Sequence, residues 1–294
     1  MAIKEGIYAA SISILNEDLS LDIDATITHA EKLIIDGCNG IAIFGSTGQS
    51  QLISASEKKK LIEKLSDNKL KEHFLIGTGE NSLNQNIEIM KHSIRNGINR
   101  FLIMPPAYYK YGDKETYSFF SNIIQQVPES EIILYNFEKL SGYKFSLQIV
   151  ERLVKDFPKQ ILGVKDSSYN LYEKLKIPKF LIFPGTETKL LKGLELGCNG
   201  IISATCNVTA PLASKVYKDF INKNKQTFND KLCLVRQAFD QYNLISGLHS
   251  FMSIEEKKYK RVLPPLTLLS DSETKELTSR LKELDFFPEK NIAA

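Results

Sequence analysis

One lysine stands at the end of a short apolar segment. Ile161, Leu162 and Val164 precede Lys165 in KQILGVKDSS, residues 159–168. Lysine is seldom buried without a partner, so the segment alone fits a strand that ends where its lysine meets water. A buried lysine has another use, because burial disfavours the ammonium and favours a neutral amine that can attack a ketone. The protonated imine withdraws electrons from the neighbouring carbon, which assists cleavage or formation of a carbon–carbon bond.

Small hydroxyl groups and a phenol follow other apolar segments. Ser46 and Thr47 lie in GSTG, residues 45–48, and Tyr135 lies near the end of EIILYNF. A tyrosine beside an imine can move the protons that these steps require. Successive backbone N–H groups beside two hydroxyls would suit a carboxylate. Together with Lys165, these groups predict a site for a 2-keto acid, although GSTG alone is typical of a turn and a lone strand-end tyrosine is typical of packing.

The elements that would position these groups are eight apolar segments, which alternate with segments of helical periodicity. The apolar segments cover residues 6–12, 40–45, 74–79, 100–106, 131–137, 160–166, 179–185 and 200–206. Apolar strands separated by helices indicate a parallel sheet covered on both faces, and eight units predict an α/β protein, a (β/α)8 TIM barrel. A doubly wound open sheet is the alternative, but it would be expected to carry a glycine-rich phosphate turn, which the sequence lacks. In a barrel the chemistry collects at the carboxyl ends of the strands.

The organisation of the chain is predicted as a barrel over residues 1–209 and a C-terminal helical region over residues 210–294. Beyond residue 209 only helical periodicity is found, and no Gly/Ser/Pro-rich linker intervenes, so this region is expected to pack on the barrel. DGCNGIAIFG and LGCNGIISAT resemble each other, and RNGINRFLIM is a weaker repeat. In each, a glycine (Gly37, Gly197 or Gly97) can end a helix in the left-handed conformation before the chain enters a strand.

Charge and composition exclude several classes of partner. The 294 residues include 38 basic and 35 acidic side chains in a mixed arrangement, with a net charge of +3, so no nucleic-acid or membrane partner is expected. We find no signal-peptide pattern and no apolar run near the ~20 residues of a membrane span. The four cysteines are Cys38, Cys198, Cys206 and Cys233. They lack CxxC spacing, so neither a zinc site nor a disulfide framework is expected. A cytoplasmic location is therefore the default expectation.

Seven motifs occur together: GIYAA, GSTGQ, PPAYY, YNFEKLSG, GVKDSS, PGTET and NGIISATCNV. In this order and at these spacings, the sequence resembles the dihydrodipicolinate synthase / N-acetylneuraminate lyase family of pyruvate-dependent class I aldolases. The motifs cover residues 6 to about 210, and a looser resemblance continues through RVLPPLTLLS, residues 261–270. The resemblance implies a lyase that needs neither a cofactor nor a metal, takes a small 2-keto acid, and assembles as a homotetramer.

The same resemblance assigns roles to individual residues. Lys165 would form a Schiff base with pyruvate, or with the pyruvyl end of a longer keto acid, and Tyr135 would be the general acid/base. Ser46 and Thr47 would hold the carboxylate, with Thr47 linking Tyr135 to Tyr108, which in the family reaches across a dimer interface. Further substrate contacts are implied for Ser167, Glu187, Thr188 and Ile202.

The acceptor half of the substrate is suggested by the segment YNFEKLSG. Synthases of the family carry an arginine that binds the carboxylate of aspartate semialdehyde, and Leu140 stands at that position. Lys139 lies next to it and could substitute. LSG instead resembles the lyases and the 2-keto-3-deoxy sugar-acid aldolases, so we expect an aldolase that cleaves or forms such a sugar acid with pyruvate as one partner. Dihydrodipicolinate synthase is the first alternative.

Glu187, for which the resemblance implies a substrate contact, also has a second interpretation. It could be a solvent-facing residue at the start of a helix, where a negative charge interacts favourably with the helix dipole.

Two alternatives belong to other classes of protein. A metal-dependent aldolase would need histidine and acidic ligands at the barrel mouth, whereas His29, His73, His92 and His249 are expected in or beside helices. A catalytically silent barrel that only binds a ligand would be expected to lack Lys165 or Tyr135, and both are present.

Overall fold

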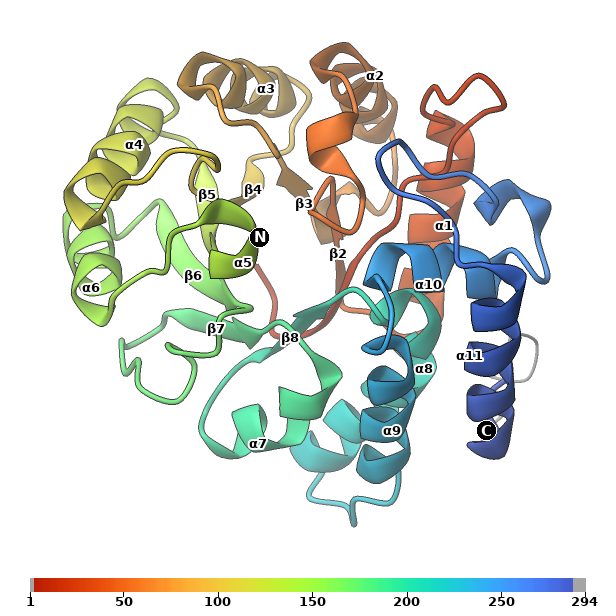
Figure 1. Ribbon diagram of the computed structural model, residues 1–294. Coiled ribbons are helices and arrows are strands. Elements are labelled where there is room, and N and C mark those ends of the chain that lie inside the picture. The colour runs from red at the N-terminus through yellow and green to blue at the C-terminus, as the bar shows by residue number, and fades with distance from the viewer. Residues whose placement is uncertain (1–2, 288–294) are drawn as a thin grey trace.

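Eight parallel strands form the centre of the computed structural model, which describes residues 3–287. The strands are β1 (Gly6–Ala10), β2 (Gly40–Ile43), β3 (Phe74–Gly77), β4 (Arg100–Ile103), β5 (Glu131–Asn136), β6 (Ile161–Asp166), β7 (Leu181–Pro184) and β8 (Gly200–Ser203). Each lies within one of the eight predicted segments, so the TIM barrel is confirmed (Figure 1). All eight strands are shorter than their predicted segments, mainly because the last residues of most segments already belong to the following loops.

The barrel is closed between its first and last hydrogen-bonded strands by an asparagine. The ladder runs β7-β6-β5-β4-β3-β2-β1-β8. The backbone N–H of Asn199 donates to the carbonyl of Ile182 and its Oδ1 accepts from the N–H of Ile182, each at 2.9 Å. Asn39 makes the same pair of bonds with Ile7, at 2.7 and 2.9 Å. The repeated sequence CNG therefore fastens the start of β2 and of β8 to the preceding strand.

The helices outside the barrel are α1 (Ile23–Ile35), α2 (Ala55–Ser66), α3 (Leu83–Arg95), α4 (Asp113–Gln126), α6 (Leu147–Asp156), α7 (Leu190–Glu195) and α8 (Cys206–Ile221), with the short α5 (Glu138–Ser141) after β5. Gly37, Gly97 and Gly197 have φ values of 113°, 77° and 90° after α1, α3 and α7, so the predicted helix-ending glycines are confirmed. One expected repeat is missing: residues 167–180, between β6 and β7, contain turns and bends but no helix.

The side chains that point into the barrel form one apolar cluster beneath the carboxyl ends of the strands. The cluster includes Tyr8, Ala10, Ala42, Leu75, Leu102, Ile133, Tyr135, Phe183 and Ile202. Successive side chains of a strand point to opposite faces, so the alternate residues, such as Ile7 and Ala9, pack outward against the helices. A buried apolar floor therefore supports whatever stands at the mouth of the barrel.

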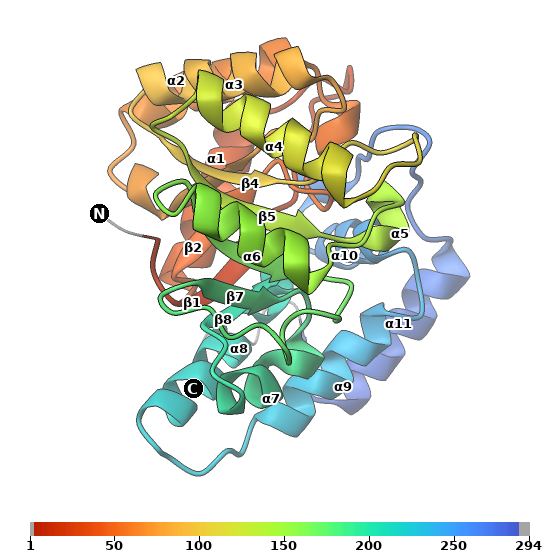
Figure 2. The ribbon, with the colours of Figure 1, turned by 90° about the vertical axis from the view of Figure 1, so that its left-hand side faces the viewer.

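The C-terminal region adds α9 (Asn229–Phe239), α10 (Leu244–Met252) and α11 (Asp271–Glu283). Residues of these helices share an apolar cluster with Ile12, Ile14 and Ala204, which follow β1 and β8. The expected boundary between residues 209 and 210 falls inside α8, the helix that follows β8. Figure 2 shows α9 and α11 side by side, with α5 and part of the C-terminal region near the carboxyl ends of the strands. The outermost parts of both predicted regions, residues 1–2 and 288–294, lie outside the described residues.

Within residues 3–287, no helix combines the length and the apolar character that a membrane crossing requires.

Candidate active site

Lys165 lies inside the barrel, directly beside Tyr135. Its side chain is only 3% exposed, and it occupies the penultimate position of β6. The register of the sheet pairs Lys165 with Tyr135 on one side and with Phe183 on the other. The Lys165 Nζ lies 4.0 Å from the centre of the Tyr135 ring. The reading in which this lysine meets water at a strand end is therefore wrong, because β6 delivers it to the buried mouth of the barrel.

The hydroxyl group bonded to Tyr135 belongs to Ser46. The Ser46 Oγ and the Tyr135 Oη are 2.9 Å apart, and either can donate. The resemblance assigned this contact to Thr47, and the structure corrects it: Thr47 is buried next to Ser46, but its hydroxyl is not the one bonded to the phenol. The correction follows from the bend of the chain after β2, which brings the first of the two hydroxyl residues to the phenol.

The loop after β2 is held in an unusual conformation. Phe44 and Gln49 have φ values of 56° and 54°, in the left-handed region that non-glycine residues seldom adopt. The carbonyl of Gly48 accepts a hydrogen bond from Ser13 Oγ at 2.7 Å, and a Cβ at Gly48 would lie 2.9 Å from the carbonyl oxygen of Ser11. This close approach explains the glycine, and it fixes the segment that carries the two hydroxyl groups.

Asp166, next to Lys165, organises the loop after β6. Its carboxylate is fully buried and accepts from the backbone N–H groups of Tyr169, Leu171 and Tyr172 at 2.8–2.9 Å. Asn136 donates to the same carboxylate at 2.8 Å. Burial raises the pKa of Asp166, and these hydrogen bonds oppose the rise. Asp166 therefore anchors the chain immediately after the lysine.

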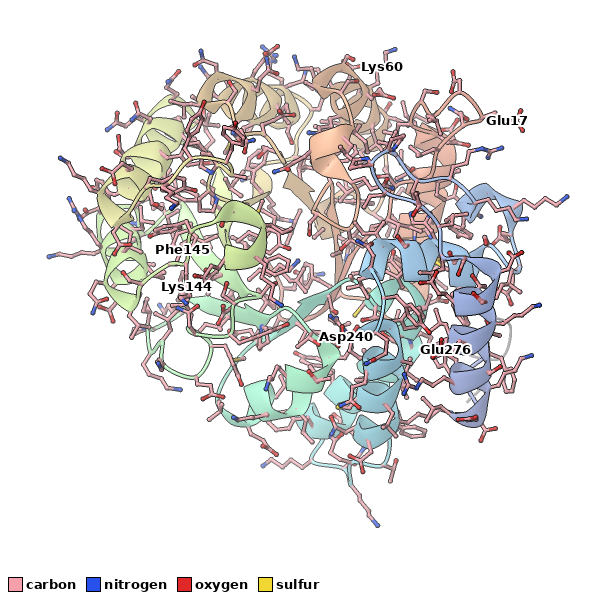
Figure 3. All side chains as sticks on the ribbon, in the orientation of Figure 1. Glu17, Lys60, Lys144, Phe145, Asp240 and Glu276 are labelled. Atoms are coloured by element: carbon pink, nitrogen blue, oxygen red, sulfur yellow. The ribbon has the colours of Figure 1, made fainter. Side chains whose placement is uncertain are left out.

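Asn136 extends this support to the segment after α5. Its Oδ1 accepts from the N–H of Phe145 at 3.1 Å, and Phe145 is labelled in Figure 3 beside Lys144. Lys144 forms an ion pair with Glu138 at 2.9 Å, and the N–H of Glu138 donates to Ser168 Oγ at 2.8 Å. The loops after β5 and β6 are thus fastened to each other.

Glu187 does not occupy either position expected from the sequence. Its side chain is 0% exposed, so it is not a solvent-facing residue, and its carboxylate is bound by groups of the protein itself. Ser203 and Thr205 donate to Oε2 at 2.6 and 2.7 Å, and Arg236 Nη1 lies 3.1 Å from the same oxygen. Burial alone would raise the pKa of Glu187, but Arg236 and the two hydroxyls outweigh burial and lower it. The carboxylate is thereby occupied by protein donors, which leaves no open face toward a substrate.

Arg236 comes from α9, so this contact ties the C-terminal region to the ends of β7 and β8. The Arg236 Nη1 also lies 3.1 Å from Ser203 Oγ, and its Nε donates to Asp240 at 2.8 Å. Asp240 lies at the end of α9 nearer the middle of the barrel (Figure 3). The sequence offered no signal for this pair, because 49 residues separate Glu187 from its partner.

A cavity of about 580 Å³ opens above Tyr135 and Ser46. Its walls come from the loops after β2 and β3, the ends of β4 and β5, α5 and the C-terminal region; they are Phe44, Gly45, Ser46, Thr47, Gln49, Ser50, Gln51, Leu52, Gly79, Leu102, Met104, Tyr135, Phe137, Leu140, Asn243, Leu244, Ile245, Pro265 and Leu266. None of these lining residues carries a formal charge; Lys165 is not among them and lies behind the ring of Tyr135. Leu140 lines the cavity, whereas its exposed neighbour Lys139 does not. The wall from the C-terminal region was missed by sequence reasoning, since only the folded chain brings it to the barrel mouth.

The remaining predicted residues do not line this cavity. Tyr108 is 89% exposed on the loop after β4, has a φ of 85°, and packs edge-on against Tyr109. Ile202 is buried in the barrel interior, in the same apolar cluster as Tyr135. Ser167 and Thr188 are half-buried after β6 and β7 and do not line the cavity. Their roles toward a substrate stay predictions.

The four histidines lie in helices, and none lines the cavity within the described part of the chain. His29 and His249 are buried, and burial lowers the pKa of each to about 4. His29 bonds Asn207 at 2.8 Å and Tyr259 at 3.1 Å, so it links α1 to α8 and to the segment after α10. Both histidines are therefore structural residues of the outer layer.

Comparison with known proteins identifies the type of barrel. The sequence profile described as the dihydrodipicolinate synthetase family matches residues 4–284. A 4-hydroxy-tetrahydrodipicolinate synthase of Methanothrix thermoacetophila is 24% identical over 95% of this chain and 97% of its own, and an N-acetylneuraminate lyase of Actinobacillus pleuropneumoniae is 30% identical over 72% and 74%. YagE from E. coli K12 belongs to the dihydrodipicolinic acid synthase family, and its crystal structure was determined in complex with pyruvate. It superposes on this chain with a TM-score of 0.87 and 23% sequence identity, over 97% of this chain and 100% of YagE.

Proposed function

The chain belongs to the dihydrodipicolinate synthetase family of carbon–carbon lyases, and we propose that it is a class I aldolase that forms an imine between Lys165 and pyruvate. The observation that carries this proposal is the buried Lys165 amine against Tyr135, whose hydroxyl is bonded to Ser46. A strongly hydrated side chain held in an apolar barrel beside a proton-transfer group is the arrangement that amine catalysis needs. The pyruvate bound in YagE supports the choice of keto acid.

We infer one task for each group. The Lys165 amine adds to the keto carbon of pyruvate, and loss of water gives the imine. Tyr135 exchanges protons with the intermediates, and Ser46 holds the phenol in position. Thr47 and the backbone N–H groups of its loop receive the pyruvate carboxylate. Loss of a proton from the methyl carbon gives an enamine, which attacks an aldehyde; the aldehyde oxygen takes up a proton, and water releases a 4-hydroxy-2-keto acid from the lysine.

The acceptor aldehyde is proposed to be uncharged. Leu140, not a cation, faces the cavity, and none of the lining residues carries a charge. An acceptor carboxylate would lose a charged hydrogen bond, typically worth about 1.5–3 kcal/mol. This favours a 2-keto-3-deoxy sugar acid, whose tail is neutral, over the dihydrodipicolinate synthase alternative. Condensation of pyruvate with aspartate semialdehyde as fast as with neutral aldehydes would refute the choice.

The experiment that tests the pyruvate half alone is exchange of its methyl protons in D2O, followed by NMR. Imine and enamine formation should replace the protons in the presence of wild-type protein, and Lys165→Ala should abolish the exchange. Tyr135→Phe should slow it strongly, since the phenol moves the proton. Absence of exchange with wild type would favour the catalytically silent barrel.

The roles of Tyr108, Ser167, Thr188 and Ile202 are proposed on the resemblance of their motifs. Tyr108 is proposed to complete the site of a second copy, and its exposure on the loop after β4 is consistent with that role. The homotetramer and the cytoplasmic location are likewise proposals from the sequence.

A further inference from the structure

The cavity above Tyr135 reaches from the reacting groups to the α9–α10 link, which is residues 240–243. Tyr135 is 4% exposed and Ser46 is half-buried, whereas Asn243, the last residue of the link, is exposed. All three line the same cavity. An acceptor that reacts beside Tyr135 therefore has room to extend its tail toward the link.

Asn243 carries one free donor, the Nδ2 of its carboxamide. Its Oδ1 accepts from the backbone N–H groups of Ile245 and Ser246 at 3.1 Å each and from Ser246 Oγ at 3.2 Å. These three donors identify the oxygen of the amide. Among residues 3–287, Nδ2 has no hydrogen-bond partner. Because the cap of α10 already holds the side chain, a ligand bonded by Nδ2 does not bear the cost of ordering it.

A second free carboxamide comes from the loop after β2. Gln51 lies in the short 3-10 helix Ser50–Leu52, is exposed and lines the cavity. Its carboxamide has no partner within the described part of the chain, and it can both donate and accept. Leu52, Leu140 and Leu244 line the same cavity. A sugar-like tail presents C–H groups as well as hydroxyls, so it suits a hydrocarbon surface that is interrupted by amides.

Most other polar groups at the mouth of the barrel have a partner or a task. Ser46 is bonded to Tyr135, and Thr47 is proposed to receive the pyruvate carboxylate. The carboxylate of Glu187 is bound by Arg236 and by two hydroxyl groups of the protein. The two carboxamides are therefore the groups left for the acceptor.

We propose that the acceptor aldehyde carries several hydroxyl groups, and that Asn243 Nδ2 donates to its terminal hydroxyl while Gln51 bonds the same end of the tail. The inference rests on the proposed function, in which the pyruvate methyl carbon bonds to the aldehyde carbon and the aldehyde oxygen takes up a proton. The α9–α10 link thereby becomes part of the acceptor site. A neutral hydroxyl is selected over a carboxylate, because no lining residue supplies a positive charge.

Two pairs of acceptors, each pair differing in the terminal hydroxyl, test this assignment: glyceraldehyde against lactaldehyde, and arabinose against 5-deoxyarabinose. For each pair we measure the ratio of kcat/KM for the hydroxylated aldehyde to kcat/KM for its deoxy counterpart. The two sugars of a pair can close into rings to different extents, so each ratio is compared between proteins, where that difference cancels. Each ratio is taken within one protein, so partial unfolding does not imitate the effect.

The variant Asn243→Ser removes the donor and keeps the helix cap, since serine also caps helices well. It should lower the ratio about 2- to 12-fold in at least one pair, the typical worth of one neutral hydrogen bond. Gln51→Met should lower the ratio in the same pair. Gln241→Ser is the matched control, because Gln241 lies in the same link, is exposed and does not line the cavity, and it should change neither ratio.

Unchanged ratios in Asn243→Ser, or an equal fall in Gln241→Ser, would overturn the proposal. A fall in Thr188→Val without one in Asn243→Ser would place the tail beside β7 and would overturn it as well. Pyruvate proton exchange by the wild-type protein separates the two levels of the argument. Exchange without addition of any of the four aldehydes overturns the acceptor assignment alone, whereas absence of exchange overturns the proposed function.

Discussion

Replacement of Arg236 by methionine tests whether Glu187 is held by the C-terminal region. The variant Arg236→Met removes the cation 3.1 Å from a carboxylate that is 0% exposed, while the Ser203 and Thr205 hydroxyls remain. Breaking a buried pair in this way typically costs about 3–5 kcal/mol, because the remaining charge is uncompensated. Each kcal/mol shifts the melting temperature of a domain of 150–250 residues by about 2–4 °C, so a fall of roughly 6–20 °C is expected in a thermal scan.

The dependence of this loss on pH identifies its cause. In wild type the pKa of Glu187 is lowered below its ordinary value of 4.5, so its contribution to stability is present above that pH and is lost as the pH falls. Without Arg236, burial dominates and raises the pKa of Glu187, so the free energy of unfolding of the variant is reduced most at high pH. The difference in melting temperature between wild type and variant should therefore shrink from pH 8 to pH 5.

Two further variants complete the test. Glu187→Gln in the Arg236→Met background should recover part of the loss, because it removes the unpaired charge. Asp240→Asn is the control, since Asp240 is 42% exposed and its pair with Arg236 is screened by solvent, so its loss should cost less than about 1 kcal/mol. A fall of less than 2 °C in Arg236→Met, or a loss that does not depend on pH, would refute the reasoning.

Three other perturbations have defined outcomes. Ser46→Ala should slow pyruvate proton exchange about 10- to 100-fold, because the Tyr135 hydroxyl loses its 2.9 Å partner. If exchange were slowed only in Thr47→Val, Thr47 and not Ser46 would be the residue that positions Tyr135. The free energy of unfolding should fall as the pH drops from 6.5 toward 4, by up to about 1.4 kcal/mol per pH unit for each of His29 and His249. The cause is that the histidines of the unfolded chain bind protons in this range, whereas the buried rings, with a pKa of about 4, do not. Thermal scans of His29→Gln should show a weaker dependence of stability on pH, and an unchanged dependence would contradict the account. Leu140→Arg should raise kcat/KM for an aldehyde that carries a carboxylate about tenfold or more relative to neutral aldehydes, and an unchanged ratio would show that this position does not face the acceptor.

The barrel and the position of Lys165 at the end of a strand could be predicted from the sequence because both depend on local patterns. Buried strands are continuous in apolar residues, and a lysine such as Lys165 at the end of one interrupts that pattern visibly. That a tyrosine of the adjacent strand lies near Lys165 was expected, but the exact pairing with Tyr135 depends on a register shift between β5 and β6 at Ile132 and Ile133. The repeated CNG sequence was noticed for its glycines, but the strand-fastening bonds of Asn39 and Asn199 required coordinates.

Contacts between distant parts of the chain could not be predicted. Glu187 was read as a substrate or surface residue because its partner Arg236 belongs to α9, which no local pattern places beside β7 and β8. That Ser46, and not Thr47, is bonded to Tyr135 depends on the backbone bend after β2, which adjacent hydroxyl residues do not encode by their types. The C-terminal side of the cavity, including Leu244, also depends on how the last helices pack.

The central claim is that Lys165 forms a Schiff base with pyruvate, and borohydride trapping tests it most directly. Wild-type protein is mixed with pyruvate, reduced and measured by intact mass, alongside Lys165→Ala and the control Lys139→Ala, an exposed lysine outside the cavity. The account predicts one reduced pyruvyl group on wild type and on Lys139→Ala, and none on Lys165→Ala. Wild type without an adduct, or an adduct that persists in Lys165→Ala, would contradict it.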